Sequence, residues 1–138
     1  GTNGIIKQIV TEDGPGSNTS YNSGSWTTII SKSITVSSSN HRVLVQVKGG
    51  FYGGDEGTVY NAARLRRGST NIWEIGTLWG RVTAGSGFKA CYAGPTIIDN
   101  PGTGTYTYYW QTRRTSGSGS DLIVHANGNN ITLTEFDP

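Results

Sequence analysis

The sequence predicts an all-β fold, a single-domain jelly-roll β-sandwich of eight to ten short antiparallel strands. Gly, Ser, Thr and Asn make up nearly half of the 138 residues, and these residue types disfavour helices. Seven Tyr, four Trp and three Phe stand among Val and Ile runs, which supplies the side chains of a core. Short alternating segments recur between turn sequences along the chain. The length fits one domain, residues 1–138.

The charge and the cysteine content exclude several classes of protein. A net charge of +2 without a block of like charges argues against a nucleic-acid partner. No apolar run is long enough to cross a membrane, so membrane insertion is not expected. Cys91 is the only cysteine, cannot form an intrachain disulfide and is predicted to be a small buried side chain. The chain starts at Gly1 without Met, and we expect it to be a processed protein or a piece of a longer one.

The first third of the chain holds predicted strands on either side of a long loop. Residues 5–10 carry apolar side chains on both faces, which predicts a strand with neighbours on both sides. Residues 12–25 are rich in Gly, Pro, Ser and Asn, which predicts a long loop. Residues 26–36 alternate between apolar and polar side chains and predict one half-buried strand, or two short strands end to end.

The middle of the chain holds the strongest strand prediction. Residues 42–47 carry Val at alternate positions, which is typical of a strand with one buried face. Residues 49–57 are predicted to be a Gly-rich loop with two aromatic residues and two carboxylates. Residues 59–67 and 72–75 alternate on either side of a Gly-containing turn, and we expect them to form a hairpin.

The last third of the chain is predicted to hold further strands. Residues 88–93 predict a short strand, and residues 99–104 are a dense turn sequence. Residues 105–113 predict a long strand rich in aromatic side chains. Residues 122–126 and 131–136 are predicted strands joined by an Asn-Gly sequence, which indicates a hairpin.

Five segments of strand and turn sequence follow one another along nearly the whole chain. They are residues 4–10 (GIIKQIV), 33–40 (SITVSSSN) running into 42–47 (RVLVQV), 63–70 (ARLRRGST), 99–108 (DNPGTGTYTY) and 130–136 (NITLTEF). In this order they resemble the C-terminal domains of bacteriophage tail fibres. Residues 51–57 and 71–94 depart from that pattern, and surface loops of this kind are where receptor specificity is expected.

The resemblance implies a jelly roll similar in shape to the heads of the complement C1q and tumour necrosis factor proteins. It implies a homotrimer at the distal end of a tail fibre of the virion, with residues 1–138 as the C-terminal part of a longer fibre protein. The implied function is non-enzymatic attachment to a host receptor, commonly a surface glycan. Two alternatives stay open: a secreted C1q-like adhesion or signalling head that binds a protein receptor, and a fibre tip that degrades polysaccharide.

Catalytic and metal-binding patterns are scarce in the sequence. It lacks the nucleophile elbow, the His-Glu-x-x-His and Cys-x-x-Cys patterns and the phosphate-binding Gly-rich loop, so no enzyme, no cofactor and no metal are expected. His41 and His125 are predicted to be surface or edge residues. Asp55 and Glu56 share one loop, but adjacent strand residues point apart, which makes them a poor pair for glycoside hydrolysis. We expect them to be solvated, with calcium ligation as the alternative.

Aromatic side chains near charged ones are the best candidates for a sugar site. Sugar rings stack their C–H faces on aromatic rings, while charged groups bind the hydroxyls. The candidate ligand-binding residues are Tyr52, Asp55, Glu56, Trp73, Trp79 and Arg81.

Two further groups of residues fall on predicted strand faces. Tyr106, Tyr108 and Trp110 share one face of the strand at residues 105–113 and are predicted to fill the core or the trimer interface. Five arginines are predicted to lie on a solvated strand face, with a basic patch against acidic surface polysaccharide as the alternative: Arg64, Arg66, Arg67, Arg113 and Arg114.

Overall fold

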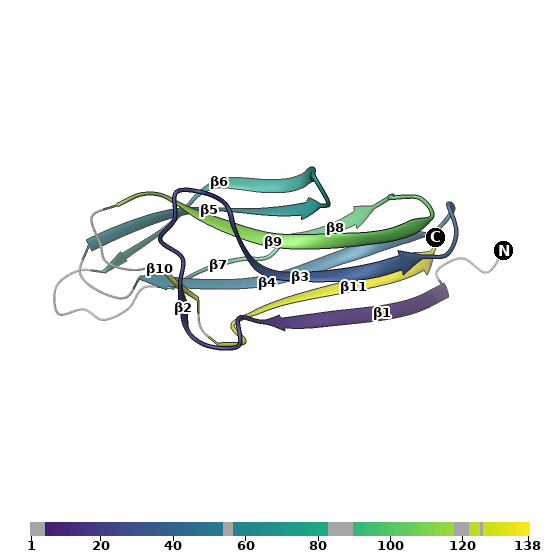
Figure 1. The fold of residues 1–138 in the computed structure, drawn as a ribbon, viewed down its shortest axis with the longest axis horizontal. Helices are drawn as coiled ribbons and strands as arrows, with labels where there is room; N and C mark the ends of the chain where they lie inside the picture. Colours follow the sequence, from purple (N-terminus) through teal and green to yellow (C-terminus); the bar gives the residue numbers. More distant parts are fainter. Residues whose placement is uncertain (1–4, 54–56, 83–89, 118–121, 125) are drawn as a thin grey trace.

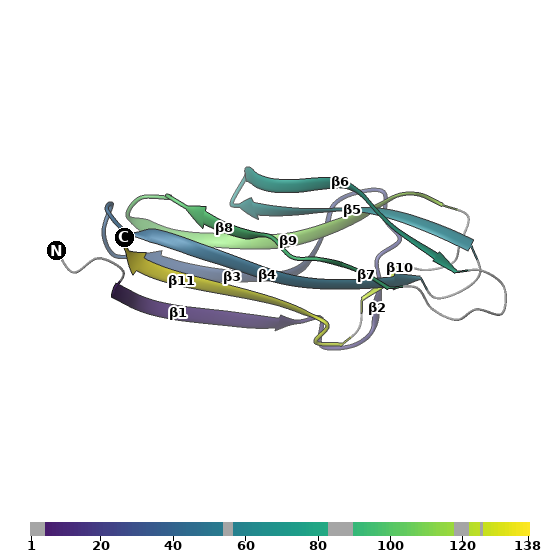
Figure 2. The same ribbon diagram turned by 180° about the vertical axis from the view of Figure 1, so that it is seen from behind.

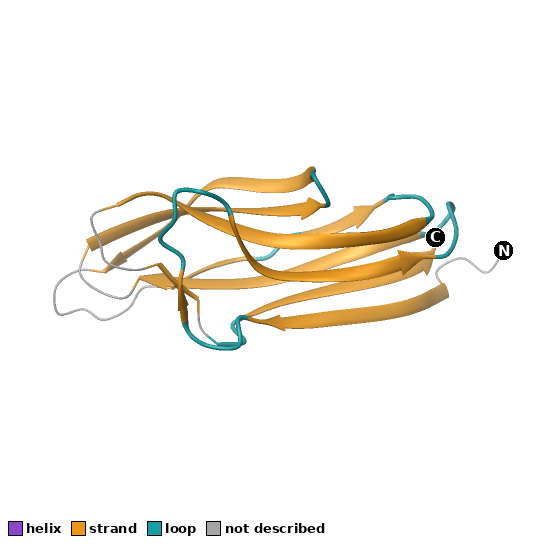
Figure 3. Ribbon diagram, viewed as in Figure 1, coloured by secondary structure: helices purple, strands orange, loops and turns teal. Residues whose placement is uncertain are grey.

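The chain folds almost entirely into β-strands. The computed structural model describes residues 5–53, 57–82, 90–117, 122–124 and 126–138 (Figure 1). Within these residues Figure 3 shows strands and loops only, and no helix there could span a membrane. The strands are β1 (Ile5–Gly14), β2 (Thr19–Ser20), β3 (Thr27–Val36), β4 (Arg42–Gly53), β5 (Gly57–Arg67), β6 (Thr70–Val82), β7 (Ala90–Ala93), β8 (Thr96–Asp99), β9 (Gly104–Gly117), β10 (Leu122–Val124) and β11 (Asn129–Asp137). The predicted all-β fold is confirmed.

The first sheet contains seven strands, and they lie in rows on either side of β4 (Figure 2). On one edge of β4, β11 pairs with residues 42–48 and β10 with residues 52–53, so β10 and β11 lie end to end. On the other edge, β8 and β7 pair with residues 43–46 and 49–52 in one continuous register. β1 and β2 form an outer row beside β11 and β10. The sheet is therefore four rows wide.

The second sheet has the strand order β3-β9-β5-β6 and packs against the first. The chain passes between the sheets at six of the ten connections between described strands, because β3, the β5-β6 hairpin and β9 belong to the second sheet and the other strands to the first. Two antiparallel sheets joined in this alternating way form a jelly-roll sandwich. The predicted all-β jelly-roll sandwich is therefore confirmed.

The inward faces of the two sheets meet in a core centred on Trp110. Val43 and Leu133 of the first sheet are fully buried, as is Trp110 of the second. The Trp110 ring lies 6.3 Å from the ring of Phe51, centroid to centroid. Its indole N–H donates to Oδ1 of Asn129 (3.0 Å), so both polar groups are paired inside the core.

The junction between β8 and β7 brings two backbones unusually close. Val47 N donates to Pro95 O (3.0 Å) and continues the ladder across the junction. A Cβ atom on Gly94 would overlap the carbonyl oxygen of Val47. Glycine therefore fits at position 94 without a shift of either backbone.

Several strand predictions were wrong, because pairing with other strands, rather than side-chain alternation, sets where these strands begin and end. Residues 49–53, predicted to begin a Gly-rich loop, continue β4, where β7 and β10 pair with its two edges. Residues 96–99 form β8, which no pattern predicts, and β6 runs to Val82 rather than ending at residue 75. Backbone hydrogen bonds to neighbouring strands hold segments whose side chains carry no alternation.

The predicted hairpin between residues 122–126 and 131–136 is wrong. β10 and β11 do not pair with each other; both run antiparallel to β4, one after the other. Asn127 does adopt the left-handed conformation that this residue type favours (φ 54°), and its N–H donates to Pro15 O (2.8 Å). The turn at Asn127 forms as predicted, but after it β11 continues alongside β4 instead of returning beside β10.

The prediction that the first strand has neighbours on both sides is also wrong. Among the described residues β1 pairs with β11 alone, so it is an edge strand. Ile6 and Ile9 are each 58% exposed. The loop predicted at residues 12–25 is shorter than expected, because β1 extends to Gly14 and β2 occupies Thr19–Ser20.

Candidate functional site

The predicted ligand-binding residues do not form one described cluster. Asp55 and Glu56 lie outside the described residues. Tyr52 lies in β4, and Trp79 and Arg81 lie in β6, but their side chains are outside the described part of the chain. The backbone of Tyr52 belongs to the first sheet and that of Trp79 to the second. His125 lies outside the described residues as well, and so does the side chain of Cys91 in β7.

The remaining aromatic candidates point into the sandwich. The Trp73 ring lies 5.9 Å from the Trp110 ring and packs against the core. Tyr108 is fully buried, and its hydroxyl donates to Oδ2 of Asp99 (2.7 Å). Tyr106 is half-buried, and its hydroxyl donates to Pro101 O (2.7 Å). Burial and the hydrogen bond to Asp99 raise the pKa of Tyr108, so its hydroxyl remains a donor.

The outer surface of the second sheet carries a different cluster, which we call the arginine face. Strand alternation turns residues 64 and 66 of β5 and residues 109, 111 and 113 of β9 toward this surface, away from the core. Trp26, just before β3, joins them. All members are half-buried. The arginine face comprises Trp26, Arg64, Arg66, Tyr109, Gln111 and Arg113.

Gln111 links the strands of the arginine face. Its Nε2 donates to Oγ1 of Thr28 on β3 (3.0 Å), and its Oε1 accepts from Nε of Arg64 on β5 (2.7 Å). The guanidinium groups of Arg64 and Arg113 lie 4.3 and 4.9 Å from the centre of the Trp26 ring. Cation–π contacts of this kind fix the orientation of both arginines. These contacts hold the side chains of the arginine face against one another.

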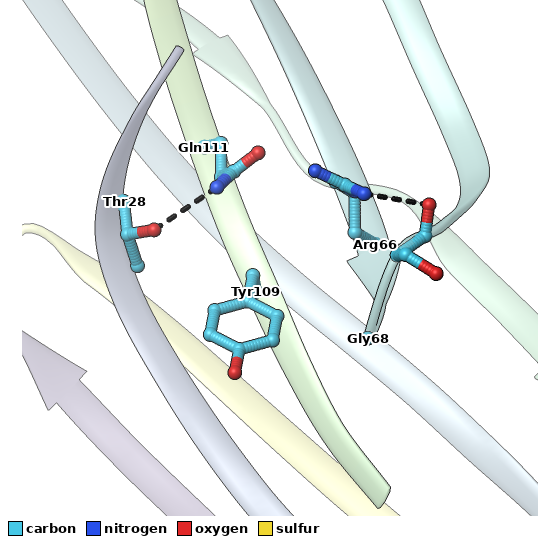
Figure 4. Close-up of a pocket in the computed structure, with 6 residues that line it drawn as sticks. Thr28, Arg66, Gly68, Tyr109 and Gln111 are labelled. Atoms are coloured by element: carbon cyan, nitrogen blue, oxygen red, sulfur yellow. Dashed lines mark hydrogen bonds between the residues drawn. The ribbon is translucent and has the colours of Figure 1, made fainter.

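A shallow pocket of about 300 Å³ opens beside Gln111 (Figure 4). Figure 4 shows Thr28 on one side, Arg66 on the other and Tyr109 with Gln111 between them. Nη2 of Arg66 donates to Ser69 O (2.6 Å), whereas its Nε has no hydrogen-bond partner among the described residues. The pocket is lined by Thr28, Arg66, Gly68, Ser69, Tyr109 and Gln111. Aromatic, amide, hydroxyl and cationic groups thus converge on one hollow.

The positive charges on the arginine face are close enough to repel one another. Burial lowers the pKa of Arg64, and the charges of Arg66 and Arg113 lower it further, while Glu74 opposes them. Glu74 is exposed on β6, and its carboxylate accepts a hydrogen bond from Nδ2 of Asn71 (2.6 Å). Three arginines therefore face one carboxylate among the described residues of this surface.

The outer surface of the first sheet is apolar near one end. Ile9, Thr134, Leu44 and Ile98 are paired side by side across β1, β11, β4 and β8 and form one row of the sheet. Ile98 is 65% exposed. The neighbouring row toward the strand ends carries Ile6, Phe136 and Arg42, and Nη1 of Arg42 donates to Asn40 O and to Oδ1 of Asn100 (3.0 Å each). We call this surface the apolar face and define it as Ile6, Ile9, Leu44, Ile98 and Phe136.

A buried polar cluster joins the ends of β1, β4 and β11. Oε1 of Glu135 accepts hydrogen bonds from Ser37 N (2.8 Å), Ser37 Oγ (2.8 Å) and Nδ1 of His41 (2.7 Å). Oε2 of Glu135 accepts from Nε2 of Gln8 (2.6 Å). In a serine–histidine–acid triad the serine and the acid contact different ring nitrogens, but here both lie near Nδ1 of His41. The cluster is structural in its geometry.

The structure divides the five arginines proposed as a basic patch. Arg64, Arg66 and Arg113 share the arginine face, whereas Nη1 of Arg67 donates to both carboxylate oxygens of Asp99 (2.6 Å each). Arg114 lies opposite Asn61 in the β9-β5 register. Sequence reasoning missed Trp26, Tyr109 and Gln111 as neighbours of these arginines. The alternation of residues 109, 111 and 113 indicates that they share a strand face. The sequence does not show which strand lies beside that face.

The comparisons with known proteins found solved structures of similar shape at low sequence identity. No family model matches the chain, and no curated protein matches it. A structure of infectious bursal disease virus, Gx strain, aligns with a TM-score of 0.46 and 12% identity over 94% of this chain and 36% of that one. A structure of the Gt strain aligns with a TM-score of 0.45 and 11% identity over 95% of this chain and 38% of that one. This chain thus spans little more than a third of each of those chains.

Proposed function

We propose that this chain is a non-enzymatic attachment domain of a virion, the homotrimeric tip of a tail fibre that binds a glycan on the host surface. The resemblance to tail-fibre domains supports the biological setting. The arginine face is the observation that carries glycan binding, because it gathers the groups that sugars require on one open surface.

Each part of the arginine face has a role in sugar recognition. The Tyr109 ring offers an apolar surface on which the C–H face of a pyranose can stack. The free hydrogens of the Gln111 amide and the guanidinium groups donate to sugar hydroxyls. Because Thr28, Trp26 and Ser69 already hold these groups in place, little side-chain entropy is lost on binding.

The apolar face supports assembly with further copies of the same chain. Large exposed aliphatic residues on one sheet surface are typical of an interface. The row of Ile9, Thr134, Leu44 and Ile98 and its neighbour, formed by Thr11, Thr132, Gln46 and Thr96, carry no charge, whereas Arg42 lies on the row nearer the strand ends. Residues near a rotation axis meet their own copies, so like charges there would repel; the two uncharged rows are therefore the part of this surface that suits the axis, with Arg42 toward its margin.

A trimer built on the apolar face would present three arginine faces on its outer sheets. Single glycan sites bind weakly, and linking several of them raises the apparent affinity by roughly 10²–10⁴. This combination suits attachment to a repetitive cell surface.

Two measurements test the proposal. Light scattering of the purified chain should give three times the monomer mass, and a strict monomer at high concentration would contradict the assembly. A glycan array should give binding that Tyr109→Ala abolishes and Lys48→Gln, on the other sheet, leaves unchanged. Binding only to a protein receptor, with no effect of glycan competitors, would favour a secreted adhesion head instead. Release of oligosaccharides from the array would identify a degrading enzyme.

A further inference from the structure

We infer that the glycan bound by the arginine face is acidic, with a sugar carboxylate held at Arg66 and the sugar ring stacked on Tyr109. The inference rests on the proposed function and names the class of its ligand. The pocket of Figure 4 is the subsite in which the carboxylated sugar would lie.

Arg66 has hydrogen-bond donors that the fold does not use. Its Nη2 is bound to Ser69 O, which orients the guanidinium, but its buried Nε has no acceptor in the part of the chain that the structure describes. Nε of Arg113 is in the same state. A carboxylate binds a guanidinium through two parallel N–H···O bonds, a geometry that neutral hydroxyls do not offer.

The charge balance of the surface also favours an anion. Arg64, Arg66 and Arg113 repel one another, and Glu74 is the carboxylate that opposes them. Asn71 donates to Glu74 from within the same hairpin, so part of that charge is already engaged. An anionic sugar in the pocket would supply the missing negative charge, and a neutral sugar would not.

The aromatic residues of the face have separate roles. Trp26 already carries two guanidinium groups against its ring, so it positions Arg64 and Arg113. Tyr109 lines the pocket, and no hydrogen bond of its hydroxyl occurs within the described chain. Tyr109 is therefore the ring that can take a sugar, next to the cation that can take its carboxylate.

The pocket suits a sugar better than a nucleic acid. Its other half is neutral, with the hydroxyl of Thr28, the amide of Gln111 and the backbone of residues 68 and 69. Neutral donors and acceptors of this kind bind sugar hydroxyls, whereas a phosphodiester chain requires a longer track of cations. The net charge of +2 for the whole chain fits the former.

Calorimetric titration with matched ligands tests the inference. The probes are oligogalacturonate, glucuronate-containing heparosan oligomers and α2,8-linked sialic acid oligomers, each beside its carboxyl-reduced neutral form at one ionic strength. At least one acidic probe should bind ten times more tightly than its neutral form. Arg66→Gln should abolish that preference, Arg66→Lys should retain part of it, and Lys48→Gln should leave it unchanged. Thermal midpoints establish that each variant is folded.

The outcomes separate this inference from the proposed function. Equal binding of acidic and neutral forms, or an acidic preference that survives Arg66→Gln, would overturn the acidic ligand while leaving glycan attachment in place. Tighter binding of single-stranded RNA than of every glycan would overturn it too. Failure of all glycans on the array would overturn the proposed function itself.

Discussion

The buried carboxylate of Glu135 makes the stability of the fold depend on pH. Glu135 is 1% exposed, on the inward side of β11, and its four hydrogen bonds reach the edge strand β1, the turn after β3 and the start of β4. Replacing it with Gln removes the charge and turns an amide donor toward another donor. We expect this variant to be less stable at neutral pH, because buried donors lose a charged acceptor.

The magnitude follows from the pKa of Glu135. Burial raises this pKa, but the hydrogen bonds from Gln8, His41 and Ser37 outweigh burial and bring it from an ordinary 4.5 to about 2. A difference of this size corresponds to about 3 kcal/mol of stability. Because the pKa is lower in the folded chain than in the unfolded chain, the contribution is fully present above about pH 4.5. It is lost as the pH falls toward about 2.

Urea unfolding followed by tryptophan fluorescence, from pH 7 to pH 2, measures this contribution. The difference between the native chain and Glu135→Gln should be about 3 kcal/mol at pH 7 and should nearly vanish at pH 2. Glu12→Gln, which breaks only the exposed pair with Lys32, should change stability by less than ~1 kcal/mol throughout. A difference that stays constant with pH would refute the reasoning. So would a carbon-13 NMR titration of the Glu135 carboxyl with a midpoint at its ordinary value.

Three further substitutions test other parts of the structure. Ile9→Asp, in the centre of the apolar face, should dissociate the assembly into folded monomers, which light scattering and circular dichroism measure together; an intact oligomer would contradict the interface. Asp99→Asn, which removes the ion pair with Arg67, should lower the free energy of unfolding by roughly 2 kcal/mol, and an unchanged urea midpoint would show that the pair adds nothing. Gly94→Ala should cost about 1–3 kcal/mol because its Cβ meets backbone, whereas Gly76→Ala, with open space around it, should be neutral or slightly stabilising in the same thermal assay.

Local side-chain patterns were enough to predict the fold class and the long strands. Val43, Val45 and Val47 alternate, and all three are buried on the inward face of β4. Tyr108 and Trp110 alternate in the same way in β9 and are fully buried. Alternation records which face of a strand is covered, and this property belongs to the strand itself.

Strand partners were not predictable, because pairing depends on residues far apart in the chain. The Asn-Gly sequence at residues 127–128 favours a turn, but whether the chain returns beside β10 depends on β4, which already occupies that edge. The Gly-rich residues 49–53 have no side-chain pattern and are held by β7 and β10. These contacts lie about 40 residues or more away along the chain, beyond the reach of a local pattern.

For the candidate site, the sequence predicts which residues share a strand face but not which strand faces come together. Arg64 and Arg66 alternate in the sequence, and so do Tyr109, Gln111 and Arg113, so each set is expected to share a strand face. That the two sets form one surface follows from the pairing of β5 with β9. The same pairing sends Arg67 to Asp99 on the inward side, which separates it from its neighbours in the sequence.

The positions of the two faces make assembly and ligand binding separable. The apolar face lies on the outer surface of the β1-β11-β4-β8 rows and the arginine face on the outer surface of the other sheet, with the core between them. Ile9→Asp should therefore leave the affinity for a soluble oligosaccharide unchanged while lowering retention on a glycan-coated surface by roughly 10²-fold or more. Arg66→Gln should lower both while leaving the oligomer intact. If Ile9→Asp weakened binding of the soluble oligosaccharide as well, the glycan site would require contacts from a neighbouring copy, which would contradict a site built within one chain.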